Sequence, residues 1–306
     1  MSLIRLSRKR TLFSGFCSYR SQPSPALRLR PVHVYEALFA MPAPFGAKPR
    51  REQLKIMFKR VTPILLSTLA FLFGWYLLTR YGGIPQFILP SPLSVWIRFI
   101  KAVQDGSLPY HTAITLSEIV LGLLVGVIFA TIVGYALARS RSLERVLSPY
   151  LVASQAIPVV AIAPLLVIWL GDGILSKVII CALIVFFPVL VNTIVGVRAV
   201  PTALYDLMNS LHATRTQILW KVEVPASLPV FLGGLRIGAT LSVIGAIVGE
   251  LVSAEKGLGF LLQLGDFQYD TPMVFVAVFM LIALALMLYG IVTLLEKRFL
   301  KWQNKN

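Results

Sequence analysis

Residues 206–225, DLMNSLHATRTQILWKVEVP, decide how the rest of this chain is interpreted, because they lie between two long apolar segments yet are polar enough to contact water. Their apolar residues recur at steps of three and four, which predicts one short amphipathic helix. We expect it to end at Pro225, since proline lacks a backbone N–H and crowds the preceding turn. A helix held in this way is typically presented to a partner. Its apolar positions are Leu207, Leu211, Ile218 and Val222.

The composition predicts an all-α polytopic membrane protein. Of the 306 residues, 57% are hydrophobic and 14% are charged, against about 25% charged in soluble domains. Several apolar stretches approach or exceed the roughly 20 residues needed to cross a bilayer. We therefore expect six transmembrane helices in a domain covering residues 58–306. They are placed near residues 61–79, 113–138, 146–170, 177–197, 228–252 and 272–295.

Residues 1–57 are predicted to be a basic, disordered N-terminal tail. The first 50 residues are rich in Arg, Ser and Pro and contain a single acid, Glu36. They lack the continuous apolar region and small-residue cleavage site of a secretory signal peptide. An organellar transit peptide has a similar composition, and a start at Met41 or Met57 is a further alternative.

The net charge of +16 is distributed as membrane topology predicts, which argues against a nucleic-acid partner. Of 29 Lys and Arg, 13 precede residue 61 and most others flank the spans. Six spans put 23 of them on the side of both termini and of residues 206–225, and 5 on the other, with Arg236 inside a span. Without the tail the ratio is still 10 to 5. Both termini are therefore expected in the cytoplasm, in a multi-pass protein of the cell membrane.

Signatures of catalysis, metals and cofactors are missing from the sequence. His33, His111 and His212 are far apart, as are Cys17 and Cys181, so neither a metal site nor a disulfide framework is expected. There is no GxxxxGK[ST] phosphate loop, HExxH or GxSxG motif. We expect a non-catalytic protein without a cofactor, in which any energy input comes from a partner.

From Pro85 to its end the chain resembles the permease subunit of bacterial ATP-binding-cassette importers, in the branch for nitrate, sulfonate, taurine and similar small nutrients. The resemblance rests on four strings: FILPSPLSVW, TLSEIVLGLLVGVIFATIVGYALA, SLHATRTQILWKVEVPASLPVFLGGLRIGATLSVIGAIVGEL and GLGFLL. It implies the type I importer permease fold. It also implies three partners: a cytoplasmic ATPase, an extracytoplasmic solute-binding protein and a second permease copy in a homodimer.

In that family the cytoplasmic segment before the fifth span is a coupling helix that docks on the ATPase. Its pattern is Glu-Ala-Ala, three residues, Gly, nine residues and Ile-x-Leu-Pro. The matching positions here are Asp206, Leu207, Met208, His212, Val222, Val224 and Pro225, with larger residues in place of the alanines and the glycine. An interfacial helix held by lipid headgroups is the alternative. The resemblance implies ATPase coupling by Asp206, Ser210, His212, Ala213, Thr214, Arg215, Thr216 and Pro225.

Three charged residues fall inside predicted spans, where facing lipid would be costly. Glu118, Arg236 and Glu250 are therefore candidates for the lining or gate of a translocation path. Alternatively, Arg236 pairs with a carboxylate or extends to the surface, and the two acids sit near the membrane surface. Gly122 and Gly126 form a GxxxG, for which helix packing is favoured over a specific dimer face.

The function expected from these features is an alternating-access permease subunit of an ATP-driven importer. A negative Glu118 near the outer mouth suits a neutral or aromatic ligand better than nitrate or a sulfonate. The same position is similar to the acid of relatives that handle riboflavin or thiamine-pyrimidine precursors. Nitrate, sulfonate or taurine import is the alternative. From other classes, an ATP-independent carrier would predict an internal repeat and mid-membrane coupling carboxylates, and a membrane scaffold also remains open.

Overall fold

The computed structural model describes residues 50–253 and 255–300, and every regular element in them is a helix. Most of the predicted tail lies outside these residues, while its end, residues 50–57, belongs to the first described helix. The chain divides into units at residues 1–64 and 65–306, and the packing described below lies within the second. The elements are α2 (Arg50–Tyr81), α3 (Pro92–Gln104), α4 (Ser107–Arg139), α5 (Arg141–Gln155), α6 (Val159–Leu170), α7 (Ile174–Arg198), α8 (Thr202–Ser210), α9 (Arg215–Ile218), the π-helical turn η1 (Leu219–Glu223), α10 (Val224–Ser253), α11 (Leu258–Phe267) and α12 (Thr271–Phe299).

Among the described residues, four helical stretches are long and apolar enough to cross a membrane. They are α4, α7, the continuous stretch Arg215–Ser253 that ends with α10, and α12, and the bent pair α5–α6 could supply a fifth. These correspond to the second to sixth predicted spans. The first predicted span, residues 61–79, lies within α2, which is not among the four. The count of six spans therefore stays a prediction.

The third predicted span, residues 146–170, was expected to be one helix. In the structure it consists of two helices, α5 and α6, which meet at 94°. The break coincides with Pro158, which has an extended backbone (φ −64°, ψ 120°) and precedes the first residue of α6. A residue before proline is driven out of the helical conformation, so Ile157 cannot continue α5. Pro149 and Pro164 are each accommodated inside a helix. No residue of α5 is buried.

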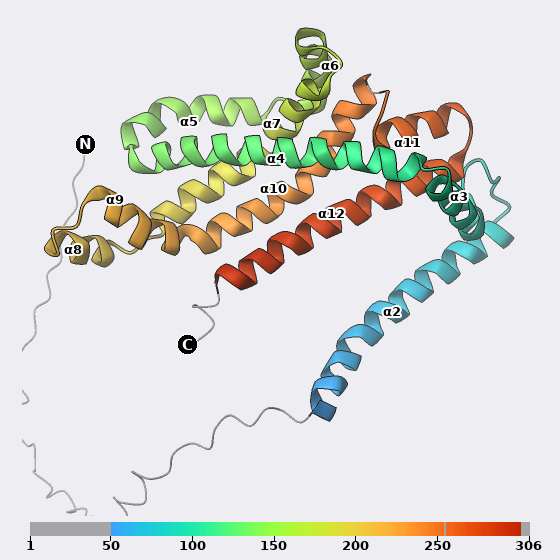
Figure 1. The fold of residues 1–306 in the computed structure, drawn as a ribbon, viewed down its shortest axis with the longest axis horizontal. Helices are drawn as coiled ribbons and strands as arrows, with labels where there is room; N and C mark the ends of the chain where they lie inside the picture. Colours follow the sequence, from blue (N-terminus) through green and yellow to red (C-terminus); the bar gives the residue numbers. More distant parts are fainter. Residues whose placement is uncertain (1–49, 254, 301–306) are drawn as a thin grey trace, which may run out of the picture. The chain divides into compact units, whose positions relative to one another are not determined.

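Helix α7 packs between glycine stripes on α4 and α10, and α10 also runs alongside α12 (Figure 1). A side chain at Gly122 of α4 would overlap Cys181 of α7, and one at Gly245 of α10 would overlap the same residue from the other side. Gly126 likewise faces Val185. The GxxxG of α4 is therefore used for helix packing within the chain, which is the interpretation favoured above over a specific dimer face. Glycine allows this close approach because it has no Cβ.

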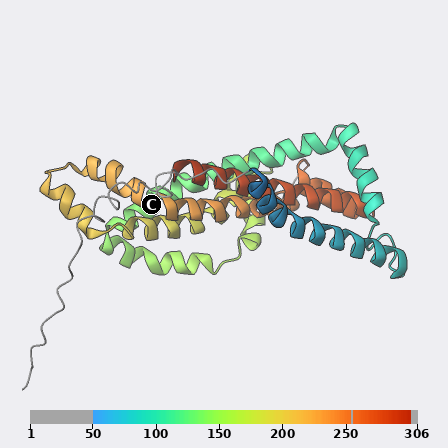
Figure 2. The same cartoon turned by 90° about the horizontal axis from the view of Figure 1, so that it is seen from below.

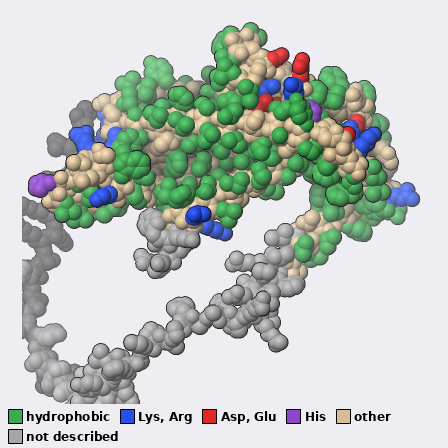
Figure 3. All heavy atoms as spheres, viewed as in Figure 1, with side chains coloured by type: hydrophobic (Ala, Val, Ile, Leu, Met, Phe, Trp, Pro, Cys, Tyr) green, Lys and Arg blue, Asp and Glu red, His purple; other side chains and the backbone are tan. Residues whose placement is uncertain are grey.

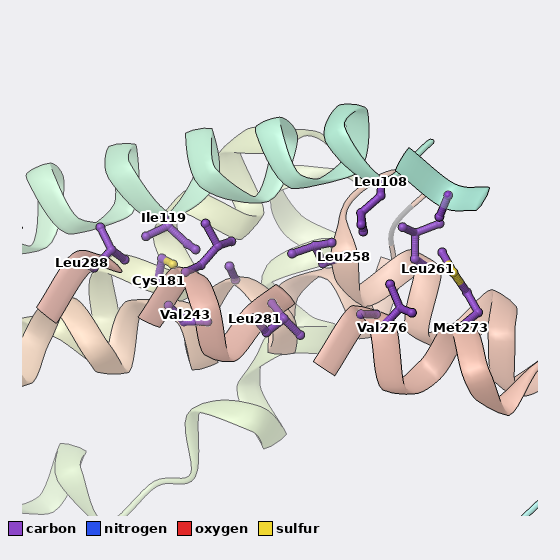
Figure 4. Packing of buried hydrophobic residues seen from close by; sticks show 14 of the residues in the cluster. Leu108, Ile119, Cys181, Val243, Leu258, Leu261, Met273, Val276, Leu281 and Leu288 are labelled. Carbon is purple, nitrogen blue, oxygen red and sulfur yellow. The ribbon is translucent and has the colours of Figure 1, made fainter. Parts of the chain in front are cut away.

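The main core lies where α4, α10, α11 and α12 converge, and Figure 4 shows Leu108, Leu258 and Val276 pointing toward one another there. The short helices lie at the two ends of the bundle: α8 and α9 at one end, α3 and α11 at the other (Figures 1 and 2). The face in Figure 3 is mostly hydrophobic, with charged side chains mainly toward helix ends. On this face the middle of the bundle is therefore apolar and its ends carry the charged side chains.

Candidate functional site

Residues 206–225 do not form the single amphipathic helix that their periodicity predicted. Helix α8 ends at Ser210, and a turn at residues 211–214 separates it from α9. His212 lies in the left-handed region with φ 51°, and the backbone N–H of Ala213 donates to the carbonyl of Met208 at 3.0 Å. Left-handed backbone is strained for most side chains, though His tolerates it better than most. The family pattern has glycine here, the residue that adopts this conformation without strain.

The turn ends at a complete capping box. The Thr214 hydroxyl accepts the Gln217 N–H, and the Gln217 side chain accepts the Thr214 N–H at 2.8 Å. Two of the free N–H groups at the start of α9 are thereby satisfied. The polar TRTQ sequence after the turn therefore starts a new helix.

Pro225 does not end a helix, which corrects the prediction made from its chemistry. The helical stretch Arg215–Ser253 runs through it. A proline inside a helix crowds the carbonyl four residues earlier, which here belongs to Lys221 within the π-helical turn η1. A π turn bonds over five residues and so loosens the backbone at that point. The wider turn lets the chain pass Pro225 without a break.

The apolar residues of this stretch also fail to share one face. Ile218 and Val222 are buried, whereas Leu207 and Leu211 are 55% and 68% exposed. The positions implied for ATPase contact are mostly exposed on the turn and its flanks, whereas Ala213 and Pro225 are partly buried. We call residues 206–216 the coupling segment. The exposed members of the implied set are Asp206, Ser210, His212, Thr214, Arg215 and Thr216.

A buried carboxylate, Glu223, ties the coupling segment to the bundle. It is 1% exposed and forms an ion pair of 2.7 Å with Arg139 at the end of α4. It also accepts hydrogen bonds from the Tyr135 hydroxyl of α4 at 3.0 Å and the Tyr205 hydroxyl of α8 at 3.1 Å. We call these four residues the Glu223 cluster. A buried acid with three donors is well satisfied, so this cluster joins α4, α8 and η1 as one unit.

Arg139 and Tyr205 reinforce the same joint. The Arg139 guanidinium lies 5.9 Å from the ring centroids of both Tyr135 and Tyr205, a cation–π distance. Burial, followed by the charge of Glu223, raises the pKa of the Tyr205 phenol. The hydroxyl therefore stays protonated and donates to Glu223.

At the opposite end of the bundle, Glu118 of α4, Lys177 of α7 and Glu250 of α10 come together. All three are buried, at 1%, 6% and 0% exposure. The Lys177 ammonium lies 3.7 Å from Glu118 Oε1, and the Thr115 hydroxyl donates to Glu250 Oε1 at 2.6 Å. We call these four residues the Glu118 cluster. Glu118 and Glu250 are thus buried in the bundle rather than facing outward from it.

The start of α11 is fastened to this cluster through consecutive backbone N–H groups. Gly257 donates to His111 Nδ1 at 2.9 Å, Leu258 to the Thr115 hydroxyl at 2.8 Å, and Gly259 to Glu250 Oε2 at 2.5 Å. These are N–H groups that a helix start leaves without intrahelical partners. Glu250 is therefore used to hold α11 in place.

A cavity of about 520 Å³ opens beside Glu118 and Lys177. Its walls come from the start of α4, the segment before α7 and the end of α10. Among its lining residues are Tyr110, Ser117, Glu118, Asp172, Lys177 and Ser253.

Arg236 lies apart from the two acids with which it was grouped. It pairs with Glu296 of α12 and lies 5.3 Å from the ring centroid of Tyr289. This is the alternative interpretation, in which the arginine is held by a carboxylate. Among residues 50–253 and 255–300, no three His, Cys, Asp or Glu side chains converge as metal ligands would.

The sequence missed Lys177 and Glu223. Lys177, the first residue of the fourth predicted span, was counted only among the charges on the non-cytoplasmic side, but it occupies the first turn of α7 and is buried against Glu118. Glu223 was passed over, although it directly follows Val222, an apolar position of the predicted helix. That neighbour was the one available indication, since the partners of both charges lie on helices distant in sequence.

Comparison with known proteins identifies the family. Residues 122–301 match the model of the "Binding-protein-dependent transport system inner membrane component" family. The chain is 44% identical over 241 residues to the riboflavin transport system permease protein RibX of Chloroflexus aurantiacus, covering 79% of this chain and 89% of that protein. It is 36% identical over 250 residues to the formylaminopyrimidine transport permease protein ThiX of Halalkalibacterium halodurans, covering 81% and 99%.

The fold has a counterpart among solved structures. A chain of the MetNI methionine ABC transporter, in an inward-facing conformation, aligns with a TM-score of 0.54 at 22% identity, covering 62% of this chain and 94% of that one. This likeness concerns the fold alone. The family model and the relatives show that the chain belongs to the binding-protein-dependent transport system inner membrane components and is a multi-pass membrane permease.

Proposed function

We propose that this chain is the membrane-spanning subunit of an ATP-driven importer and that residues 206–216 dock on its cytoplasmic ATPase. The observation that carries the proposal is the exposed polar turn after α8, tied to α4 through the buried Glu223 cluster. Family membership supports it. In this account both termini are cytoplasmic and the protein hydrolyses no ATP itself.

The Glu223 cluster gives the coupling segment a means of moving the bundle. Tyr205 belongs to α8 and Arg139 to α4, and both contact the same carboxylate. A displacement of α8 by a closing ATPase dimer would therefore be transmitted to α4, and through η1 to α10. Packed helices with two alternative arrangements respond to such a displacement as rigid bodies, which is the basis of alternating access.

One permease copy supplies half of a translocation path in this proposal, so a second copy completes a homodimer. A solute-binding protein delivers substrate at the end of the bundle that carries α3 and α11. Asp206 lies within α8 and Arg215 begins α9, so the docking surface presents both signs of charge.

The substrate we favour is a heterocyclic vitamin or precursor, such as riboflavin or a thiamine pyrimidine. The named relatives at 44% and 36% identity support this class. So does the Glu118 cluster, because nitrate or an alkyl sulfonate carries only acceptors and cannot donate to the unpaired Glu118 Oε2. Nitrate, sulfonate or taurine in the same role is the second candidate. An ATP-independent carrier or a membrane scaffold is the alternative from another class.

The test is ATP hydrolysis by the permease co-purified with its ATPase in lipid, with the solute-binding protein added. We expect loaded binding protein to stimulate hydrolysis in the wild type and not in the double variant Asp206→Lys, Arg215→Glu. The matched control is Glu144→Lys with Arg198→Glu, which reverses the two charges of an ion pair outside the coupling segment and away from α3 and α11. If no ATPase co-purifies, or if both double variants behave like the wild type, the proposal fails.

A further inference from the structure

The cavity beside the Glu118 cluster contains hydrogen-bonding atoms that the protein does not use. Glu118 is 1% exposed, lines the cavity, and its Oε2 has no hydrogen-bond partner. The Ser253 hydroxyl, also in the lining, is buried without a partner as well. A buried polar atom without a partner costs about 1–3 kcal/mol, and more when it is charged. Such atoms are expected where a ligand supplies the missing partner.

Lys177 adds unused donors at the same place. Its ammonium lies 3.7 Å from Glu118 Oε1, which is close enough for an ion pair but longer than a hydrogen bond. An ammonium carries three N–H donors. The cavity therefore offers an acceptor on Glu118 and donors on Lys177 side by side, both on rigid helices.

The charges around the cavity select the chemistry of the ligand. Behind Glu118 lies the second buried acid, Glu250, and the rim adds Asp172, Glu255 and Lys256. A nitrate or an alkyl sulfonate carries only acceptor oxygens, so it would leave Glu118 Oε2 without a donor. A bare cation would instead meet Lys177 in the wall. A neutral group with adjacent donor and acceptor atoms satisfies both side chains.

We propose that this cavity is a recognition site within the permease for the neutral lactam, imide or aminopyrimidine edge of a transported heterocycle. Glu118 Oε2 accepts from the ligand N–H, and the Lys177 ammonium donates to the adjacent carbonyl oxygen or ring nitrogen. A cavity of about 520 Å³ is within the usual size of small-molecule sites. The proposal rests on the proposed function and deepens it, because it gives the membrane subunit its own part in selecting the substrate.

The test is direct binding to the permease–ATPase complex in nanodiscs, without the solute-binding protein. The probes are riboflavin, riboflavin methylated at its imide nitrogen, the hydroxymethyl aminopyrimidine precursor of thiamine, and ethanesulfonate, an anion without a donor. We expect at least one of the two unmodified heterocycles to bind and ethanesulfonate not to bind. Glu118→Gln should weaken that binding about tenfold or more, as expected for a lost hydrogen bond to a charged acceptor.

If riboflavin is the heterocycle that binds, its methylated analogue isolates the contact to Glu118. Methylation should weaken binding about tenfold in the wild type and cause no further loss in Glu118→Gln, because the N–H and its acceptor form one interaction. The matched control is Ser154→Ala in α5, which does not line the cavity and whose hydroxyl donates to the Leu151 carbonyl in its own helix. It should bind within about twofold of the wild type, since it loses no contact to the ligand.

Four results overturn the site: neither heterocycle binds the wild type, ethanesulfonate binds, Glu118→Gln binds as tightly as the wild type, or Ser154→Ala loses as much as Glu118→Gln. A bound riboflavin whose methylated analogue binds equally well also overturns it. These failures are distinguishable from a failure of the proposed function, because stimulation of ATP hydrolysis by the binding protein does not depend on them. Thermal unfolding of each variant shows whether a loss of binding reflects loss of the fold.

Discussion

The two buried charged clusters of this bundle are built from similar residues but differ in how fully they are satisfied. Glu223 has three donors, Arg139, Tyr135 and Tyr205, within 2.7–3.1 Å. Glu118 has one partner, Lys177, at 3.7 Å, and leaves Oε2 unpaired next to a cavity. A satisfied buried acid stabilises one arrangement of helices, whereas an unsatisfied one reduces stability until something binds to it. We therefore interpret the first as a joint and the second as a site.

The largest effect is expected from breaking the joint on its basic side. Arg139→Met removes the only cation paired with Glu223 among the described residues, while keeping most of the side-chain volume. The buried carboxylate is then left with two phenol donors, so stability should fall by about 3 kcal/mol. Thermal unfolding in nanodiscs measures this, with Arg145→Met as the exposed control. Equal melting of the two variants would contradict the joint.

A smaller loss is expected when the fastening of α11 is cut. Thr115→Val keeps the shape of the side chain but removes a hydroxyl that donates to Glu250 and accepts from the Leu258 N–H. Two buried groups lose a partner, which should cost about 2 kcal/mol. The rate of amide hydrogen exchange at the start of α11 should also increase in Thr115→Val. Ser117→Ala, two residues further along α4, is the control. If it causes the same loss of stability, the effect does not come from the hydrogen bonds of Thr115.

Replacing Glu118 should raise the stability of the protein, in contrast to the two substitutions above. Glu118→Met removes the surplus acid and leaves Lys177 with Glu250 nearby, so we expect a gain in stability of about 1 kcal/mol. Glu223→Met should instead destabilise, because its three donors lose their acceptor. The pair of melting temperatures tests the comparison directly: a loss for both variants would mean that Glu118 is a structural group like Glu223.

The smallest expected effect concerns the two left-handed non-glycine residues of the described chain, His212 within the coupling segment and Tyr269 in the turn before α12. Replacing either by Gly relieves backbone strain, which favours the fold by about 1 kcal/mol or less after the entropy of glycine is counted. Melting curves of both single variants measure it. His212→Val should destabilise, and a Val variant that melts with the wild type would contradict the strain.

The helical class, four of the expected spans and the polar segment between two of them could be predicted, because apolar length and periodicity are local properties. The continuation of the helix through Pro225 could not be predicted, since the π turn at η1 that accommodates this proline is not visible in residue types. The same holds for the 94° bend at Pro158. Glu118 and Glu250 were recognised as costly charges, but Lys177 was not, because its partner lies on another helix. Contacts between distant segments are the part that patterning does not contain.

The central claim is that the permease moves its substrate only when a partner hydrolyses ATP. The most direct measurement is uptake of riboflavin, and separately of the aminopyrimidine probe, into liposomes containing the permease–ATPase complex, with the binding protein outside. We predict uptake of one of them with ATP inside and none with a non-hydrolysable analogue, and loss of uptake in the variant Asp206→Lys, Arg215→Glu. Equal uptake without ATP hydrolysis would contradict the account and make the chain an ATP-independent carrier.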